Sequence, residues 1–281
     1  MQASRNLPVA AALVALISVQ TGAAFAKSLF PLVGAEGVAA LRLGMSALLL
    51  SVWFRPWRLW RARPDWVALL GYGVMLGLMN LLIYRAFMYI HVSLAVSIEV
   101  IGPLAVALLN SRRRMDVLWV ALALLGLALL PFGQLGGGLD VRGVGYALAA
   151  ALCWALYMVF GARAAEGGGQ TVATGMLAAA LFAVPLGAAQ AGAALLTPMA
   201  LGVGLLVAAL SSMLPFLLDM YAMRWLPARV FGVLLSASPA MSALAGWWVL
   251  GETLSPLQAL GVGAIMLACA GSAVFGRAAP A

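Results

Sequence analysis

The sequence predicts an all-α polytopic membrane protein with ten transmembrane helices, and three observations support that fold class. Of the 281 residues, 65% are hydrophobic and only 9% are charged. About a quarter of the residues in a typical soluble domain are charged, so 16 basic and 8 acidic side chains are too few to cover a water-soluble globule of this size. The third observation is a succession of apolar runs with short connections, which leaves no room for an extramembrane domain.

Each apolar run is close to the length of a helix that crosses a bilayer, which takes about 20 residues. Lipid offers no partner to backbone N–H and C=O groups, so runs that are apolar on every face are expected to be helical. The ten predicted spans are 8–30, 36–54, 66–90, 92–110, 116–132, 141–162, 170–190, 199–222, 228–250 and 256–276.

The first run also has features of a signal peptide, because Arg5 precedes it and Ala24-Phe25-Ala26 matches a cleavage pattern. Apolar sequence resumes through Leu29-Phe30, however, and 8–30 is long enough to span a membrane by itself. We therefore expect it to be retained as the first transmembrane helix.

The basic residues alternate with the apolar runs. Lys27 and Arg142 fall at one end of the runs, while Arg42 and Arg85 lie within them. The other twelve fall at the opposite end: Arg5, Arg55, Arg58, Arg61, Arg63, Arg112, Arg113, Arg114, Arg163, Arg224, Arg229 and Arg277. Lys and Arg mark the cytoplasmic side of membrane proteins, so both termini are predicted to be cytoplasmic. That orientation requires an even number of spans, in agreement with ten.

Five spans carry the first half from inside to outside, so the second five are predicted to have the opposite orientation. Pro103 and Pro239 are each followed, thirteen positions later, by an acidic residue, Asp116 or Glu252, and then by the last span of that half. Inverted repeats with proline-interrupted helices are the layout of many secondary transporters. The predicted units are a first five-helix repeat at 1–133, a second at 141–276 and a cytoplasmic tail at 277–281.

Glu99 is the first candidate for a functional residue. Counted from the outer end of the 92–110 span, it lies about 10 Å deep. Ionisable residues inside a membrane are energetically expensive and mark substrate or proton pathways. Pro103, on the same face, frees a backbone carbonyl near Glu99. The functional interpretation is a proton- or amine-binding carboxylate; the alternative is a structural partner for Arg42 or Arg85.

Three basic side chains fall in the outer third of the first three spans. Snorkelling to the headgroups explains Lys27 and Arg85 well. Arg42 is deeper, which favours a polar partner such as Glu99. Together the three could make an outer vestibule attractive to a carboxylate.

Further polar, aromatic and proline residues form stripes or clusters on single helices and are candidates for lining a cavity. The alternatives are helix–helix hydrogen bonding or packing, and for Asp219 also pairing with Arg224 or Arg229. The candidates are Gln20 in line with Lys27, Asn80 with Tyr84, Trp154 with Tyr157, Ser212 with Pro215 and Asp219, and Ser236, Ser238 and Ser242 around Pro239. Pro103, Pro215 and Pro239 are predicted hinges or helix breaks.

The sequence gives little support to a catalytic function. His91 is the single histidine, and no metalloprotease motif, carboxylate pair or Ser/His/Asp set can be assembled. Gly136-Gly137-Gly138 is not followed by Lys-Ser/Thr, so any pumping is expected to run on an ion gradient. Cys153 and Cys269 lie inside apolar runs and indicate neither a disulfide nor a metal site. The net charge of +8 is explained by topology, so neither a nucleic-acid partner nor a cofactor is expected.

Seven stretches, together with the ten-helix pattern, resemble a known family. They are Gln20–Ala23, Ala26–Ala35, Ala40–Leu43, Pro56–Leu59, Gly102–Leu108, Ser111–Arg113 and Leu250–Leu254 with Gln258 after it. The chain resembles the EamA family of the drug/metabolite transporter superfamily, and within it the amino-acid exporters of the bacterial inner membrane. The resemblance covers nearly the whole chain and is most specific in the first half.

The resemblance implies export of small neutral amino acids, threonine and homoserine foremost, in exchange for protons. The family's acid in the 92–110 span falls on Glu99. Its acid in the 199–222 span falls on Asp219, where the family has Glu. The family often has an acid directly before the proline of the 228–250 span; here that residue is Ser238, which leaves Glu99 as the stronger candidate for coupling.

The favoured mechanism is alternating access by rocking of two inverted halves around a midplane cavity. The ammonium group of an amino acid would lie near Glu99, and its carboxylate near Arg42 or a broken-helix N-terminus. A second interpretation is efflux of lipophilic cations, with Trp154 and Tyr157 as a stacking wall. A third, an intramembrane enzyme or lipid-handling protein, needs a second polar cluster that the sequence does not reveal. The motif from Gly73 to Gly77 leaves the choice between monomer and homodimer open.

Overall fold

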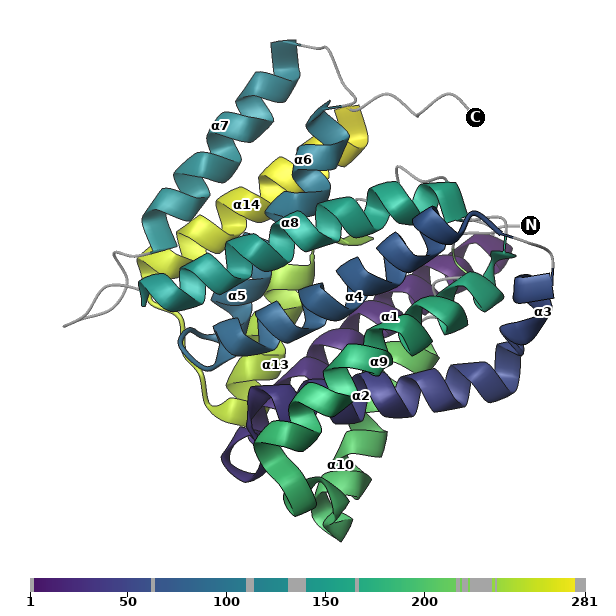
Figure 1. The fold of residues 1–281 in the computed structure, drawn as a ribbon. Helices are drawn as coiled ribbons and strands as arrows, with labels where there is room; N and C mark the ends of the chain where they lie inside the picture. The colour runs from purple at the N-terminus through teal and green to yellow at the C-terminus, as the bar shows by residue number, and fades with distance from the viewer. Residues whose placement is uncertain are drawn as a thin grey trace.

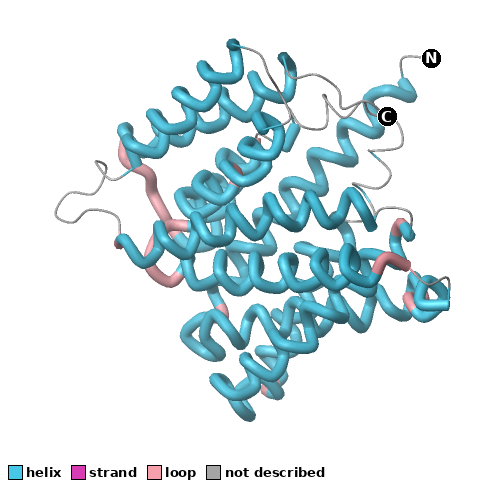
Figure 2. The backbone as a smooth tube through the Cα atoms, turned by 45° about the horizontal axis from the view of Figure 1, so that its top comes forward, coloured by secondary structure: helices cyan, strands magenta, loops and turns pink. Residues whose placement is uncertain are grey.

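The computed structural model describes residues 3–61, 64–109, 114–130, 140–164, 167–215, 218, 222, 234–235 and 237–275. Within these ranges the regular structure is helical throughout, and Figure 2 shows helices joined by short loops. The all-α fold class is therefore confirmed.

The helices of the first half begin and end close to the predicted spans. The elements are α1 (Ala3–Ser28), α2 (Phe30–Phe54), α3 (Trp57–Arg61), α4 (Trp66–Phe87), α5 (Val92–Glu99), α6 (Ile101–Leu109) and α7 (Arg114–Leu129). Helix α2 is kinked at Gly34, whose φ of 69° is a left-handed conformation that glycine adopts without strain. The short helix α3 was not predicted, and it lies in the arginine-rich connection after α2.

The second half follows the same pattern. Its described elements are α8 (Val141–Ala164), α9 (Gly169–Ala191), the 3₁₀ turn η3 (Gly192–Leu196), α10 (Pro198–Ala208), the π-helical turn η4 (Ala209–Met213), α13 (Ser238–Leu250) and α14 (Pro256–Phe275). Residues 216–217, 219–221, 228–233 and 236 of the predicted 199–222 and 228–250 spans lie outside the described residues, as does the connection 223–227 between them.

Five helical segments in the described part are long and apolar enough to cross a membrane. They are Leu7–Ser28, Phe30–Phe54, Trp66–Phe87, Val141–Ala164 and Gly169–Leu196. Three shorter apolar helical segments accompany them: Val92–Val106, Pro198–Met213 and Pro256–Gly271. The chain is therefore a multi-helix membrane protein, as its composition predicts.

The helices run between two ends of the molecule (Figure 1). The α1–α2 and α4–α5 junctions, the start of α8 and the α13–α14 turn lie toward the left of that view. We call this the Lys27 end. Helix α1 begins and α14 ends toward the right, on the same side as α3. The most extensive helix contacts are those of α2 with α9, α4 with α8, α7 with α14, α4 with α9 and α1 with α13.

Small residues allow these helices to approach closely. A Cβ atom at Gly126 on α7 would lie 2.6 Å from the Gly261 carbonyl oxygen on α14, and a Cβ at Gly261 would lie 2.7 Å from the Gly126 carbonyl oxygen. The motif from Gly73 to Gly77 faces α9 of the same chain, where a Cβ at Gly73 would lie 2.8 Å from the Gly175 carbonyl oxygen. This motif therefore serves packing within the chain.

The first helix is part of the same core. Ala24 and Ala26, which give the N-terminus its resemblance to a cleavage site, are fully buried. Helix α1 packs along α13 and also contacts α10 and η4.

Candidate functional site

Arg42 lies midway along α2 and reaches two other helices. Its Nη1 donates a hydrogen bond to the Tyr84 hydroxyl on α4 at 3.0 Å, and its Nη2 donates to the backbone carbonyl of Ser211 in η4 at 3.1 Å. The guanidinium carbon lies 5.7 Å from the centre of the Tyr84 ring, within the range of a cation–π contact. Tyr84 is fully buried between Phe30 and Phe87. Aromatic packing therefore fixes one of the two partners of Arg42.

The other partner, the Ser211 carbonyl, lies one helical turn before Pro215. In an α-helix the N–H of residue 215 would bind the carbonyl of Ser211, and in a π-helical turn it would bind that of Leu210. Proline has no N–H to donate. The Leu210 carbonyl instead accepts a hydrogen bond from the Ser18 hydroxyl on α1 at 2.7 Å. The missing N–H of Pro215 leaves one of these two carbonyls without a backbone donor, and side chains from α1 and α2 bind both of them.

Unpaired polar atoms gather on the same helices. Arg42 Nε and the hydroxyls of Ser46, Ser211 and Ser212 are buried, and the described residues provide no hydrogen-bond partner for them. Ser46 lies one turn after Arg42 on α2, and the Ser211 hydroxyl lies against Gly22 on α1, where a Cβ atom would collide with it. Buried polar groups without a partner are unfavourable, and each one in a native structure needs an explanation such as a bound water, an ion or a functional role. These atoms are therefore candidates for binding a small polar molecule.

Glu99 is the last residue of α5 and is only 8% exposed. Within the described ranges, no hydrogen bond or ion pair is recorded for its carboxylate. Among the described residues, Arg42 on α2 is close enough to act on it electrostatically, and Cys153 on α8 is also within the range of its charge. A buried carboxylate and a half-buried guanidinium therefore lie near each other without a recorded hydrogen bond or ion pair between them.

The structural alternative for Glu99 was an ion pair with Arg42 or Arg85. Arg42 instead binds Tyr84 and the Ser211 carbonyl. Arg85 pairs with Glu36, with 2.6 Å between Arg85 Nε and Glu36 Oε1. Neither arginine is recorded in an ion pair with Glu99, so both of its candidate partners are engaged elsewhere.

Pro103 and Pro239 lie in the first turns of α6 and α13. A proline is tolerated there because the first N–H groups of a helix have no partner within it. In the first half, the break falls at Val100, between the end of α5 at Glu99 and the start of α6 at Ile101. Glu99 is thereby placed at a helix end and not within a continuous helix.

The serines around Pro239 bind backbone carbonyls close by in the sequence. The Ser238 hydroxyl donates to the Leu235 carbonyl at 2.6 Å, and the Ser242 hydroxyl donates to the Pro239 carbonyl at 2.9 Å. These bonds fit the structural alternative for Ser238. Asp219, the second candidate acid, lies outside the described residues, as does Ser236.

Three ion pairs lie at the Lys27 end. They are Lys27–Glu252 at 2.7 Å, Arg85–Glu36 and Arg142–Asp140 at 2.8 Å. Bonding to Arg142 holds the pKa of the exposed Asp140 carboxyl below its usual range. Lys27 and Arg85 were expected to line a vestibule, and both have a carboxylate partner here. Sequence reasoning considered neither Glu36 nor Glu252 as a partner, although both fall at the same predicted end as these cations.

The remaining candidates are buried or half-buried within the bundle. Asn80 donates a hydrogen bond to the Leu76 carbonyl of its own helix at 2.8 Å, which satisfies part of its amide. Gln20 is buried on α1, and Trp154 is half-buried against the core. No contact between these three side chains and Arg42 is recorded for the described part of the chain.

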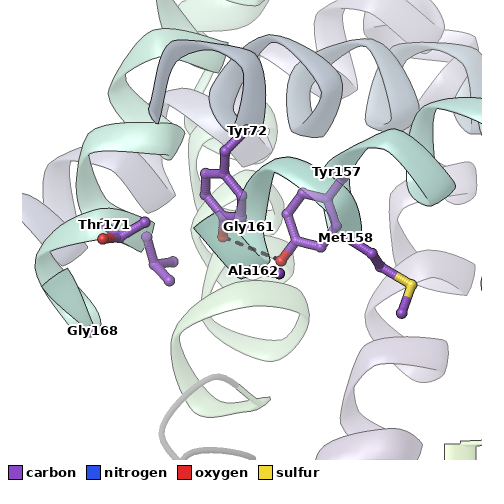
Figure 3. Close-up of a pocket in the computed structure, with 8 residues that line it drawn as sticks. Tyr72, Tyr157, Met158, Gly161, Ala162, Gly168 and Thr171 are labelled. Atoms are coloured by element: carbon purple, nitrogen blue, oxygen red, sulfur yellow. Dashed lines mark hydrogen bonds between the residues drawn. The ribbon is translucent and has the colours of Figure 1, made fainter. Parts of the chain in front are cut away.

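Tyr157 belongs to a different place, a cavity of about 320 Å³ between α4, α8 and α9 (Figure 3). Its hydroxyl lies 3.1 Å from that of Tyr72, and the two rings stack with 4.6 Å between their centres. The other lining residues are small or apolar apart from Thr171, whose hydroxyl donates to the Ala164 carbonyl. The lining carries no charged side chain, so this cavity lacks the groups that bind a zwitterion.

Membrane-length helices around a half-buried arginine, a buried carboxylate and unpaired hydroxyls are features expected of a polytopic membrane transporter. The EamA-like transporter family model matches residues 141–274. The chain is 51% identical over 273 residues to the threonine/homoserine exporter RhtA of Escherichia coli K12, covering 96% of this chain and 92% of that protein. It is 49% identical over 276 residues to RhtA of Salmonella typhimurium SL1344, covering 98% and 94%. The chain belongs to the EamA-like transporter family, a family of transporters and not of enzymes.

One solved structure extends the likeness to the fold. A crystal structure covers 95% of this chain and 96% of its own chain with a TM-score of 0.61 and 23% sequence identity. At that identity the likeness concerns the fold alone.

Proposed function

We propose that this chain exports small neutral amino acids, threonine and homoserine among them, across the inner membrane of a bacterium in exchange for protons. The observation that carries the proposal is the identity of about half of all residues, over nearly the full length, to exporters named for those two substrates. The polar site around Arg42 gives the proposal a physical basis.

The proposed topology has ten spans, cytoplasmic termini and two inverted five-helix halves. Twelve of the sixteen basic residues fall on the side assigned to the cytoplasm, so the Lys27 end would face the periplasm. The helix contacts support the duplication. Spans two, four and five pack against their counterparts seven, nine and ten, which are the pairs α2 with α9, α5 with α13, and α7 with α14. The contact of α4 with α8 is mirrored by that of α10 with α1.

The substrate would lie between Arg42 and Glu99. Arg42 offers the unpaired Nε and two Nη groups, and a guanidinium is suited to a carboxylate because it can bind both oxygens. Glu99 offers the ammonium group a carboxylate for which the described residues provide no other partner. Proton binding at Glu99 would release the ammonium group, so the proton and the amino acid would exclude each other from the site. That exclusion is what exchange of a proton for a substrate requires.

The unpaired hydroxyls of Ser211 and Ser212 would give the site a preference among amino acids. A site built to hydrogen-bond a substrate hydroxyl discriminates strongly against an analogue that lacks it, because its own polar groups are left unpaired. Threonine and valine have nearly the same shape and differ in that hydroxyl. The proposal therefore predicts that threonine is transported at least roughly tenfold faster than valine.

The test is a panel of radiolabelled amino acids offered to purified protein in proteoliposomes, with and without a proton gradient. Threonine and homoserine should be transported, and the gradient should change their rates. Transport of no amino acid, together with efflux of a lipophilic cationic dye, would replace this proposal with the drug-efflux alternative. Valine and threonine moving at equal rates would remove the serine hydroxyls from the specificity argument.

A further inference from the structure

Lys27 and Glu252 lie 225 residues apart in the sequence and form an ion pair at the Lys27 end. Lys27 is the penultimate residue of α1, and Glu252 follows α13 in the turn that leads to α14. Their side chains are 21% and 11% exposed, so the pair is shielded from solvent compared with Arg142 of the neighbouring pair, which is 69% exposed.

Both members of the pair also bind the α4–α5 junction. Lys27 Nζ donates a second hydrogen bond to the Ile90 carbonyl at 3.2 Å. Glu252 Oε2 accepts a hydrogen bond from the Val92 backbone N–H at 2.9 Å. The ion pair thus binds the backbone on both sides of His91. We call the Lys27 and Glu252 side chains, the Ile90 carbonyl and the Val92 N–H the clamp.

The clamp caps the helix that carries Glu99. His91 is the N-cap residue of α5, but its side chain makes no capping hydrogen bond. Glu252 binds the first N–H of that helix instead, and a carboxylate at a helix N-terminus is favourable because it neutralises unpaired N–H groups and the positive end of the helix dipole. Helix α5 spans only Val92–Glu99, so the clamped end and the candidate coupling residue are two turns apart.

Local structure holds Glu252 in this position. Gly251 ends α13 in a left-handed conformation with φ of 68°, which turns the chain so that the Glu252 N–H binds the Gly246 carbonyl at 3.1 Å. Gly246 has no side chain, and a Cβ atom there would lie 2.9 Å from Glu252 Oε2. The absence of a side chain at Gly246 therefore leaves room for the Glu252 carboxylate beside α13.

We propose that the clamp of Lys27, Glu252 and the backbone of Ile90 and Val92 is the periplasmic gate of the transporter, and that it positions Glu99 through α5. The proposal rests on the orientation and the exporter function proposed above. While the clamp is formed, α1 and the α13–α14 turn are fixed to the α4–α5 junction. Opening the periplasmic side breaks the ion pair and uncaps α5. Lys27 and Glu252 act here as positioning residues and not as substrate ligands.

Cys153 provides a reporter for the test, because it lies on α8 within the range of the Glu99 charge. In a Cys269→Ala background it is the single cysteine of the chain. A membrane-impermeant maleimide is added to right-side-out vesicles, and the labelling rate is measured for the parent, for Lys27→Gln, for Glu252→Gln and for both together. Glu252→Gln keeps an amide oxygen that can accept the Val92 hydrogen bond, so the fold is retained while the ion pair is lost. Asp140→Asn, which removes the exposed ion pair at the same end, is the matched control.

Each single substitution should raise the labelling rate about tenfold, and the double substitution should raise it no further, because both remove the same interaction. Asp140→Asn should leave the rate unchanged. Unchanged rates in both single variants, or gains that multiply in the double variant, would overturn the gate. Faster labelling only in inside-out vesicles would also overturn it, because the clamp would then face the cytoplasm.

The labelling rate depends on no substrate, so the two proposals can fail separately. Labelling that rises as expected, in a protein that moves no amino acid, leaves the gate standing and removes the proposed function. If the parent transports threonine and the clamp substitutions do not change the labelling rate, the proposed function stands and the gate is overturned.

Discussion

Arg42 donates a hydrogen bond, at 3.1 Å, to the Ser211 carbonyl, which lies one helical turn before Pro215. The same proline leaves the Leu210 carbonyl to Ser18. A helix that loses backbone bonds at a proline usually kinks, and here side chains of two other helices replace the lost donors. The carbonyls just before Pro215 therefore anchor Arg42 and Ser18, and three of our predictions concern this connection.

Pro215→Ala should lower threonine transport by about tenfold while leaving the protein at least as stable. The new backbone N–H would allow this turn to adopt an α-helical register, in which it competes with Arg42 for the Ser211 carbonyl and releases the guanidinium from its position. Transport in proteoliposomes and thermal unfolding in detergent measure the two effects. Pro185→Ala, at the proline inside α9, is the matched control and should transport normally. Equal losses in both variants would show that proline flexibility, and not the Arg42 contact, is what matters.

Arg42→Lys should abolish most transport although it keeps the positive charge. A lysine ammonium is a single point of charge on a flexible stem and cannot reach Tyr84 and the Ser211 carbonyl with the geometry of a guanidinium. We expect the transport rate to fall by at least about tenfold. Threonine uptake with Arg42→Lys at the parent rate would remove the guanidinium from the substrate site.

Ser18→Ala should lower the free energy of unfolding by about 1 kcal/mol, within the range measured for hydrogen bonds between membrane helices. The Leu210 carbonyl would lose the Ser18 hydroxyl, which takes the place of the backbone N–H that Pro215 lacks. Ser28→Ala, which removes an exposed bond to the nearby Phe25 carbonyl, is the control and should have little effect. Denaturant titration in mixed micelles compares the two, and equal stabilities would contradict the role of Ser18.

Gly261→Ala should destabilise the protein by about 1–3 kcal/mol, because its Cβ would press on the Gly126 carbonyl and force α7 and α14 apart. Gly263→Ala, on the same helix, meets no atom within 4 Å and should be neutral or slightly stabilising. Thermal unfolding of the two variants side by side tests the close approach of the helices. A loss of equal size in Gly263→Ala would point to helix propensity instead of packing.

The sequence predicts the helices well because lipid leaves the backbone no other structure. For example, 141–162 and 170–190 were expected where α8 covers Val141–Ala164 and α9 covers Gly169–Ala191. Helix breaks were partly predictable, since Pro103 indicates an interruption and the helix does end at Glu99. The π-helical turn η4 was not, because no local pattern distinguishes a π turn from an α turn.

The sequence predicts how many charged residues of each sign lie at the outer end, but not which ones pair. The predicted outer end carries the cations Lys27, Arg85 and Arg142 and, by the same spans, the acids Glu36, Asp140 and Glu252. Three of each sign at one end indicate pairing, and the structure pairs them one to one. Which acid meets which cation depends on how helices from the two halves pack, and a single sequence does not contain that information.

The charged residues of the site could be predicted from the sequence, but the backbone group that binds Arg42 could not. Arg42 and Glu99 stand out because an apolar span contains each of them. The Ser211 carbonyl that binds Arg42 is invisible in the sequence, since every residue has a carbonyl and only tertiary structure shows which one faces Arg42. Ser18 was missed for the same reason.

The measurement that tests proton-coupled export most directly is threonine transport by purified protein in proteoliposomes under an imposed proton gradient, for the parent and for Glu99→Gln. Asp140→Asn serves as a control for the loss of a carboxylate elsewhere. The parent and Asp140→Asn should accumulate threonine in response to the gradient, and Glu99→Gln should not respond to it. Glu99→Gln with full, gradient-dependent threonine transport would contradict the assignment of the proton to Glu99.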